Sequence, residues 1–262
     1  MQEEKKKRGI DVSDNQGVID WQQVKSAGVE FAILRSVRRS GKPDHQFAAN
    51  LAGCQAQGIP VSVYKYTYAT LQQASTEEAQ QVVALLQSHG LENTLVWWDV
   101  EDRGTLRTIS AEELTACIRA AQAVIEAAGY RFGIYVGLYV YREKWFDFSP
   151  FATVPLWVAR YPSRTEKTLE YTPAERYKPN VGRTIWGWQY SSNGRIPGIS
   201  GPVDLDVCYQ DLEGPEPAET GTGVIWIVSV ADVWTQAQAE EARRQFAAIG
   251  ITGVVHKVQI LE

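Results

Sequence analysis

The chain has 262 residues, 44% of them hydrophobic, which is enough for one large domain or for a large domain with a small one beside it. A formal net charge of −5 argues against a nucleic-acid binder. Three histidines and three cysteines are scattered along the chain, so we expect no metal site, no cofactor and no disulfide framework, but buried thiols at Cys54, Cys117 and Cys208.

The chain starts with MQEEKKKR, a basic run that lacks the apolar segment of a signal peptide. No stretch of about 18 apolar residues follows anywhere, so the sequence predicts no transmembrane helix and no membrane partner. The protein could be a mature form whose signal has been removed, or a protein released by another route such as lysis.

Segments typical of strands and of helices alternate from Gly9 to about Leu212. The predicted strands are residues 9–12, 31–35, 61–66, 95–101, 131–136, 156–159 and 184–189. The predicted helices are residues 20–27, 44–57, 76–89 and 110–128. We expect residues 145–183 to be irregular, because they lack clean helical periodicity.

Two of the helices carry clear end signals. The helix predicted from Thr76 has Glu77 and Glu78 in its first turn, where carboxylates stabilise the helix dipole. The helix predicted from Ser110 has Glu113 three residues on, the spacing of a capping box.

The order of these elements predicts an α/β fold with a parallel sheet and helices outside it. About eight strands over some 200 residues favour a closed, TIM-like (β/α) barrel over an open sheet. The irregular region before the last strands indicates that the barrel departs from the regular pattern near its end.

A linker is predicted after the barrel, at residues 213–223, because EGPEPAETGTG contains almost nothing apolar. Residues 224–262 then predict a small βαβ unit, with strands at 224–230 and 251–260 and a helix at 236–249. About 40 residues bury little core alone. This unit must therefore pack on the barrel, pair with a second copy or be marginally stable.

The strongest chemical signal is LVWWDVED, in which an apolar strand leads to Asp99 and Glu101. Residues two apart on a strand point to the same side, roughly 6–7 Å apart. At the carboxyl end of a barrel strand they face the active-site mouth, where one carboxyl can stay protonated while the other is ionised. Glycoside hydrolysis needs such a pair. On the pattern alone, the two acids could also lie at a solvated strand end.

Two further acids lie where a barrel would bring them to the same mouth. Asp11 ends the first predicted strand, and Asp204 lies in VDLDVCY near the end of the barrel. Spacing alone leaves other interpretations open: Asp11 could be a turn or cap residue, and either Asp204 or Asp206 could be a surface acid.

Several segments, taken together, resemble glycoside hydrolase family 25, muramidases with an irregular β/α barrel. They are GIDVSDNQGVIDW, FAILRSV, VYKYTYA, WWDVED, GIYVG, PLWVARY and WGWQYSSNGRIPGISGPVDLDVCY, in the family's order. The resemblance covers roughly residues 9–212, the predicted barrel.

The resemblance implies hydrolysis of the β-1,4 bond between N-acetylmuramic acid and N-acetylglucosamine in peptidoglycan, at the cell wall, with retention of configuration. Glu101 matches the general acid that protonates the leaving oxygen. Asp99 matches the partner that orients the substrate's own acetamido group, an exception to the two-carboxylate scheme. Asp11 and Asp204 match acids that hold the sugar and set the pKa values of the pair, and Asp204 fits this pattern better than Asp206.

The resemblance also implies a substrate groove, whose matching positions are Tyr64, Tyr66, Trp157, Arg160, Trp188 and Gln189. From the sequence alone each aromatic could equally be a core residue. The chain departs from the family at Lys65, where relatives carry His, and at Trp97 and Trp98, which are bulkier than usual. These departures leave the catalytic acids in place and put the substrate preference in doubt.

The C-terminal unit resembles one half of a SPOR domain, a module that binds glycan strands without peptide. This resemblance implies wall binding or self-association through residues 224–262, although a generic βαβ fragment fits as well. For the barrel two rivals remain: a non-catalytic wall-binding module of the same fold, and a chitinase-like hydrolase. The second lacks support because WWDVED supplies only the last two acids of the chitinase-type D-x-x-D-x-D-x-E run.

Overall fold

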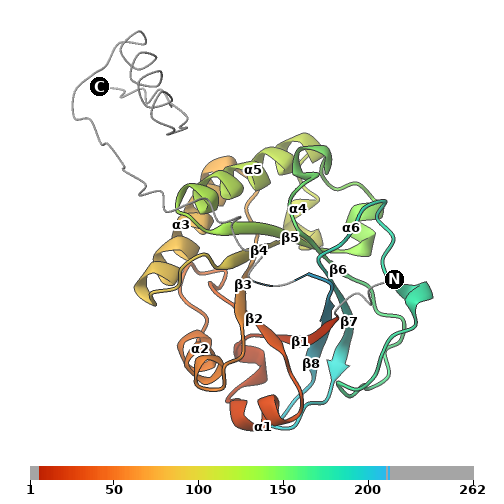
Figure 1. The fold of residues 1–262 in the computed structure, drawn as a ribbon. Helices are drawn as coiled ribbons and strands as arrows, with labels where there is room; N and C mark the ends of the chain where they lie inside the picture. The colour runs from red at the N-terminus through yellow and green to blue at the C-terminus, as the bar shows by residue number, and fades with distance from the viewer. Residues whose placement is uncertain (1–5, 211, 213–262) are drawn as a thin grey trace, which may run out of the picture. The chain divides into compact units, whose positions relative to one another are not determined.

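The computed structural model describes residues 6–210 and 212, and eight strands in it form a closed barrel in chain order (Figure 1). The strands are β1 Lys7–Val12, β2 Phe31–Arg35, β3 Val61–Tyr66, β4 Leu95–Asp99, β5 Arg131–Gly137, β6 Leu156–Ala159, β7 Gly187–Gly194 and β8 Val203–Cys208. The α-helices are α1 Trp21–Ser26, α2 Phe47–Ala56, α3 Gln72–Ser88, α4 Arg103–Leu106, α5 Ala111–Ala127 and α6 Leu138–Arg142. The predicted barrel is confirmed.

The sheet is parallel from β1 to β7, but β8 runs antiparallel to both β7 and β1. The prediction of a parallel sheet is therefore wrong for β8. A parallel connection needs a crossover of a dozen or more residues, usually a helix, and the short loop between β7 and β8 can only reverse the chain.

Side chains along each strand alternate between the barrel interior and the layer beneath the helices. On β4, Leu95 and Trp97 belong to the interior cluster, while Val96 and Trp98 pack in the outer core. Asp99 continues the interior series. Gly133 on β5 leaves room for the Trp97 ring, because a Cβ built there would lie 2.6 Å from it.

The helices mostly begin and end near their predicted bounds. Ser110 and Glu113 form the predicted capping box at the start of α5. The start of α3 was predicted wrongly: the helix begins at Gln72, so Glu77 and Glu78 lie beyond its first turn. The apolar spacing that starts near Thr76 indicates which face of the helix is buried. It does not indicate where the helix begins.

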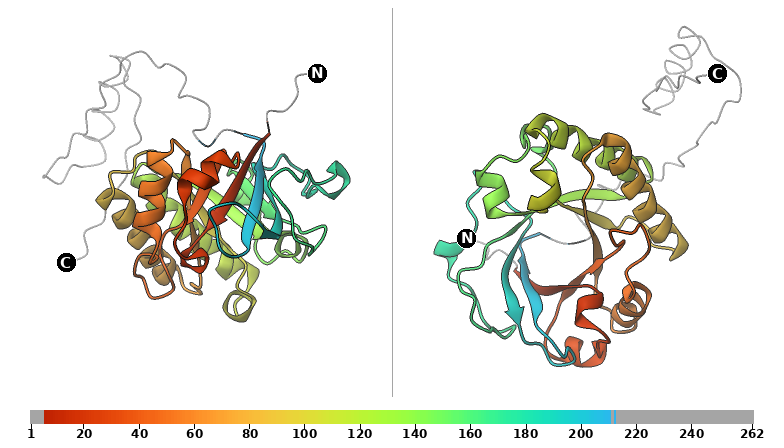
Figure 2. Two further views of the ribbon diagram at one scale, coloured as in Figure 1. Left: turned by 90° about the horizontal axis from the view of Figure 1, so that it is seen from below. Right: turned by 180° about the vertical axis from the view of Figure 1, so that it is seen from behind.

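Irregular segments lie outside β6 and β7, as predicted for residues 145–183, whereas α3 and α5 cover the other side of the barrel (Figures 1 and 2). Arginine side chains bind backbone carbonyls there. The Arg183 guanidinium donates to the carbonyls of Phe151, Ala152 and Val154, so it joins this segment to the chain before β7.

Cys54, Cys117 and Cys208 are all buried, as expected. None of the helices within residues 6–210 is long and apolar enough to cross a membrane. The predicted linker at 213–223 and the βαβ unit at 224–262 lie outside the described residues, so both stay predictions.

Candidate active site

Four acids meet in one cavity, at the carboxyl ends of the parallel strands and the amino end of β8. Asp11 comes from β1, Asp99 ends β4, Glu101 follows it, and Asp204 comes from β8, where it is the register partner of Asp11. They line a cavity of about 140 Å³. The other lining residues are Tyr64, Tyr66, Tyr135, Trp157, Tyr161 and Gln189.

Gln189 on β7 organises one wall of this cavity. Its Nε2 donates to Asp11 Oδ2 at 2.6 Å, and its Oε1 accepts from the hydroxyls of Tyr135 at 2.8 Å and Tyr161 at 2.5 Å. These three bonds fix both ends of the amide. They hold Asp11 in place with a neutral donor rather than with a cation.

A fifth acid, Asp206, lies one step deeper on the same face of β8 as Asp204. It is 0% exposed, and its Oδ1 accepts from Trp157 Nε1 at 2.9 Å. Burial and the charge of Asp204 raise the pKa of Asp206 well above its usual value. Asp204 lines the cavity and Asp206 does not.

The acids are arranged so that they resist ionisation. Burial, followed by the charge of Asp102, raises the pKa of Glu101 to about 7. Burial, followed by the charges of Glu101 and Asp11, raises the pKa of Asp99 well above its usual value. Burial and Asp11 do the same for Asp204. A carboxyl that stays protonated near neutrality can act as a general acid.

Lys65 opposes this trend from the outer side of β3. It is 0% exposed, and its Nζ donates to the Tyr66 carbonyl at 2.7 Å and to Glu78 Oε1 on α3 at 3.2 Å. Glu78 also accepts from Thr67 Oγ1 at 2.6 Å. Among the charges that act on Asp99, that of Lys65 lowers the pKa, whereas burial and the neighbouring acids raise it.

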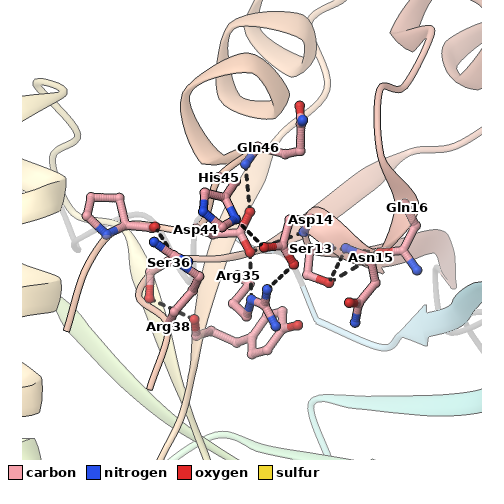
Figure 3. Close-up of polar contacts among 12 residues, drawn as sticks. Ser13, Asp14, Asn15, Gln16, Arg35, Ser36, Arg38, Asp44, His45 and Gln46 are labelled. Atoms are coloured by element: carbon pink, nitrogen blue, oxygen red, sulfur yellow. Dashed lines mark hydrogen bonds and ion pairs between the residues drawn. The ribbon is translucent and has the colours of Figure 1, made fainter. Parts of the chain in front are cut away.

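A second polar cluster holds the chain that follows Asp11 (Figure 3). Arg35, the last residue of β2, binds Asp14 and the buried Asp44, the latter at 2.6 Å from its Nε. His45 Nδ1 lies 2.8 Å from Asp14 Oδ2. Burial acts to raise the pKa of Asp14, but the hydrogen bond with His45 and the charge of Arg35 outweigh burial and lower the pKa. The cluster joins the segment after β1 to the start of α2.

The structure brings together most of the residues predicted for the site. Tyr64, Tyr66, Trp157 and Gln189 line the cavity with the four acids, but Arg160 and Trp188 do not. Trp188 lies in the outer core and donates from Nε1 to the Arg160 carbonyl at 2.8 Å, while the Arg160 guanidinium donates to the Tyr177 carbonyl at 2.8 Å.

Sequence reasoning missed Tyr135 and Tyr161, which line the cavity. Both lie in segments that carry the family resemblance, GIYVG and PLWVARY. Tyr135 could have been found from alternation, because it is two residues from Gly133 on the interior face of β5. Tyr161 follows β6 in a loop, where no period predicts the direction of a side chain.

A closed β/α barrel with a cluster of protonatable acids at its carboxyl end defines a class of protein, the barrel glycosidases. The family model for glycosyl hydrolases family 25 matches residues 10–199. The chain belongs to this family, which confirms the resemblance seen in the sequence, and it is a glycosidase.

Individual relatives agree with this assignment. The chain is 25% identical over 199 residues to an autolytic lysozyme of Clostridium acetobutylicum, with 76% of this chain and 55% of that protein aligned, so the match spans about half of the relative. A lysozyme structure from Streptomyces coelicolor is 26% identical, with a TM-score of 0.62 over 76% of this chain and 90% of that chain. The autolysin LytC of Streptococcus pneumoniae, solved with a synthetic peptidoglycan ligand, is 26% identical, with a TM-score of 0.64 over 79% of this chain and 47% of the autolysin.

Proposed function

We propose that this glycosidase hydrolyses the β-1,4 bond between N-acetylmuramic acid and N-acetylglucosamine in peptidoglycan, acting on the cell wall. The observation that carries the proposal is the acid pair of Asp99 and Glu101 at the mouth of the barrel, flanked by Asp11 and Asp204. Relatives named as an autolytic lysozyme and as an autolysin with a peptidoglycan ligand support the choice of substrate.

Glu101 supplies the proton for the leaving group. With its pKa raised to about 7, the carboxyl is protonated in much of the enzyme at neutral pH. Donation to the glycosidic oxygen avoids expulsion of a sugar alkoxide. The carboxylate that remains then accepts a proton from the water that completes hydrolysis.

Asp99 acts on the substrate's acetamido group. Its Oδ1 is buried and has no hydrogen-bond partner within the described part of the chain, so it is available to accept the amide N–H of the substrate. That donor, and the positive charge that develops as the acetamido oxygen attacks the anomeric carbon, both favour the ionised form of Asp99. Asp99 therefore stabilises the transition state more than the ground state, and the reaction retains configuration.

Asp11 and Asp204 help to keep the pKa of Asp99 raised. Their charges act on Asp99, and that of Asp11 is among the larger causes of its raised pKa. The lining aromatics Tyr64, Tyr66 and Trp157 present ring faces and edges on which a sugar can pack. Arg160 and Trp188 do not contact the sugar in this proposal; their hydrogen bonds hold the loop after β6.

The proposal is tested by release of reducing ends from purified peptidoglycan and from chitin. We expect release from peptidoglycan by the wild-type chain and loss of it in Asp99→Asn. Release from chitin alone would assign the chain to the chitinase-like class. Binding to wall without release of ends from any wall type would make it a non-catalytic module.

A further inference from the structure

A short basic hairpin stands at the rim of the cavity, directly after β2. Val37 and Pro43 form an antiparallel bridge, Arg38 N donates to the Lys42 carbonyl at 2.9 Å, and Gly41 N donates to the Arg38 carbonyl at 3.0 Å. Gly41 has a φ of 77°, which favours glycine at this turn. We call residues 37–43 the basic hairpin.

Aromatic rings connect the hairpin to the cavity. The Arg39 guanidinium lies over the Tyr68 ring, 4.3 Å from its centroid. Tyr68 in turn packs on Tyr66, with the ring centroids 4.9 Å apart, and Tyr66 lines the cavity. Arg39 is therefore held two side chains away from the catalytic acids.

The charge of Arg39 is available to a ligand. Arg35 is paired with Asp14 and Asp44, and Arg38 Nε donates to the Pro43 carbonyl at 3.0 Å. Arg39 is exposed, and within residues 6–210 its guanidinium has no hydrogen-bond or ion-pair partner. Lys42 on the same hairpin is exposed too.

The carboxylate whose pKa responds to Arg39 is already occupied. Asp102 Oδ1 accepts from Thr105 N at 2.8 Å and from Thr105 Oγ1 at 2.5 Å, and Asp102 Oδ2 accepts from the Tyr66 hydroxyl at 3.3 Å. Burial acts to raise the pKa of Asp102, but these hydrogen bonds and the charge of Arg39 outweigh it, so the pKa lies below its usual value. The guanidinium edge remains open to a second carboxylate.

We propose that Arg39 and Lys42 bind carboxylates of the stem peptide carried by the muramic acid next to the scissile bond. This inference rests on the proposed function, because it requires peptidoglycan in the cavity. A chain with a net charge of −5 repels an anionic polymer, and two cations beside the cavity offset that repulsion locally. An exposed guanidinium held flat by an aromatic ring can take a carboxylate through two parallel hydrogen bonds.

The experiment compares one peptidoglycan in two forms. Carbodiimide with ammonium chloride converts its free carboxylates into primary amides, which removes the charge and keeps the glycan and the peptide. We expect Arg39→Gln/Lys42→Gln to reduce the wild-type preference for the charged form over the amidated form about fivefold, mainly through KM. Raising the NaCl concentration should reduce the same preference in the wild type.

Lys25→Gln/Arg119→Gln is the matched control, because it removes the same charge from exposed positions on α1 and α5. An equal loss of preference in this control would overturn the proposal, since net charge alone would then explain it. An unchanged preference in the Arg39→Gln/Lys42→Gln variant would also overturn the proposal, provided that this variant folds and binds peptidoglycan as the wild type does.

Two further arms keep the explanations apart. Glycan strands stripped of peptide expose the lactyl carboxylate of muramic acid instead, and a full effect of Arg39→Gln/Lys42→Gln on them would overturn the stem-peptide assignment. Failure of the wild-type chain to cut either form of peptidoglycan would contradict the proposed function itself. Thermal unfolding of each variant checks that the fold is intact.

Discussion

Glu101 follows β4 rather than lying within it, and its environment differs from that of an ordinary surface acid in two ways. It is largely buried, and Asp102, the next residue, adds a negative charge beside it. Both effects disfavour the carboxylate and keep a proton on the side chain. The adjacency of these two acids in the chain is thus part of the proposed chemistry.

Replacing Glu101 with Gln tests the role of that proton. The amide keeps the shape of the side chain and has no transferable proton, so we expect kcat on peptidoglycan to fall by a factor of about 10² to 10⁴. Circular dichroism and thermal unfolding should show an intact fold. A variant that keeps more than about a tenth of the wild-type rate would rule out Glu101 as the acid.

The pH dependence of kcat/KM should report the same group. Glu101 must be protonated to act, and burial with the charge of Asp102 raises its pKa to about 7. Above about pH 7, activity should therefore fall tenfold per pH unit. Asp102→Asn removes the negative charge and keeps an oxygen for Thr105, so its alkaline limb should move to lower pH. A limb that stays in place would mean that another group titrates.

For single residues, the positions of the four acids that line the cavity could be predicted, and the walls around them only in part. Asp11, Asp99 and Asp204 lie on strands, where a period of two predicts the side that a side chain faces. Arg160 was placed in the groove by resemblance, but backbone carbonyls of an irregular loop hold its guanidinium. Sequence periodicity carries no information about such loop contacts.

Among the elements, β3 and α3 are joined by an ion pair that is unusual in its burial. Lys65 is 0% exposed on the outer face of β3, and Glu78 on α3 binds it together with Thr67 Oγ1. The pair fixes the end of β3, where Tyr64 and Tyr66 enter the cavity.

A double-mutant cycle measures this pair. Glu78→Gln leaves the Lys65 ammonium buried without a counter-charge and should cost about 3 kcal/mol of unfolding free energy. Lys65→Met should cost less, because Glu78 keeps the Thr67 hydroxyl and partial contact with water. The double variant should be more stable than the sum predicts by at least about 1 kcal/mol, measured by urea unfolding. Additive costs would mean that the two charges do not interact.

The elements themselves were mostly predictable because strands and helices alternate and each has its own period. The start of α3 was not, since its N-cap residue, Leu71, has no capping side chain. Of the two acids that suggested a first turn, Glu78 binds Lys65 and Glu77 accepts from Gln73. The short α4 and α6 were also missed. A helix of one turn shows too few residues for a period.

Across the whole molecule, the barrel closes on itself between Lys7 and Cys208, where β8 pairs with β1. Within residues 6–210, each of the eight strands has two neighbours, so the barrel leaves no edge for a further strand. The antiparallel β8 achieves this closure without a crossover helix. It also brings Asp204 opposite Asp11, so closure of the barrel and assembly of the site depend on the same strand pair.

Closure within the barrel predicts that deletion of residues 214–262 leaves a soluble and active enzyme. Thermal unfolding should remain cooperative, and the rate on soluble peptidoglycan fragments should stay within about twofold of the full chain. Loss of activity on insoluble wall alone would assign wall binding to the deleted unit. Insolubility would show that the unit covers part of the barrel.

The central claim is that the barrel cuts the glycosidic bond at the anomeric carbon of muramic acid in the glycan strand. Digestion of purified peptidoglycan, reduction with borohydride and mass spectrometry of the fragments test it most directly. We predict reduced muramic acid at the new ends, produced by the wild-type chain and absent with Glu101→Gln. Reduced glucosamine at the new ends would contradict the account, because the enzyme would then cut the other glycosidic bond.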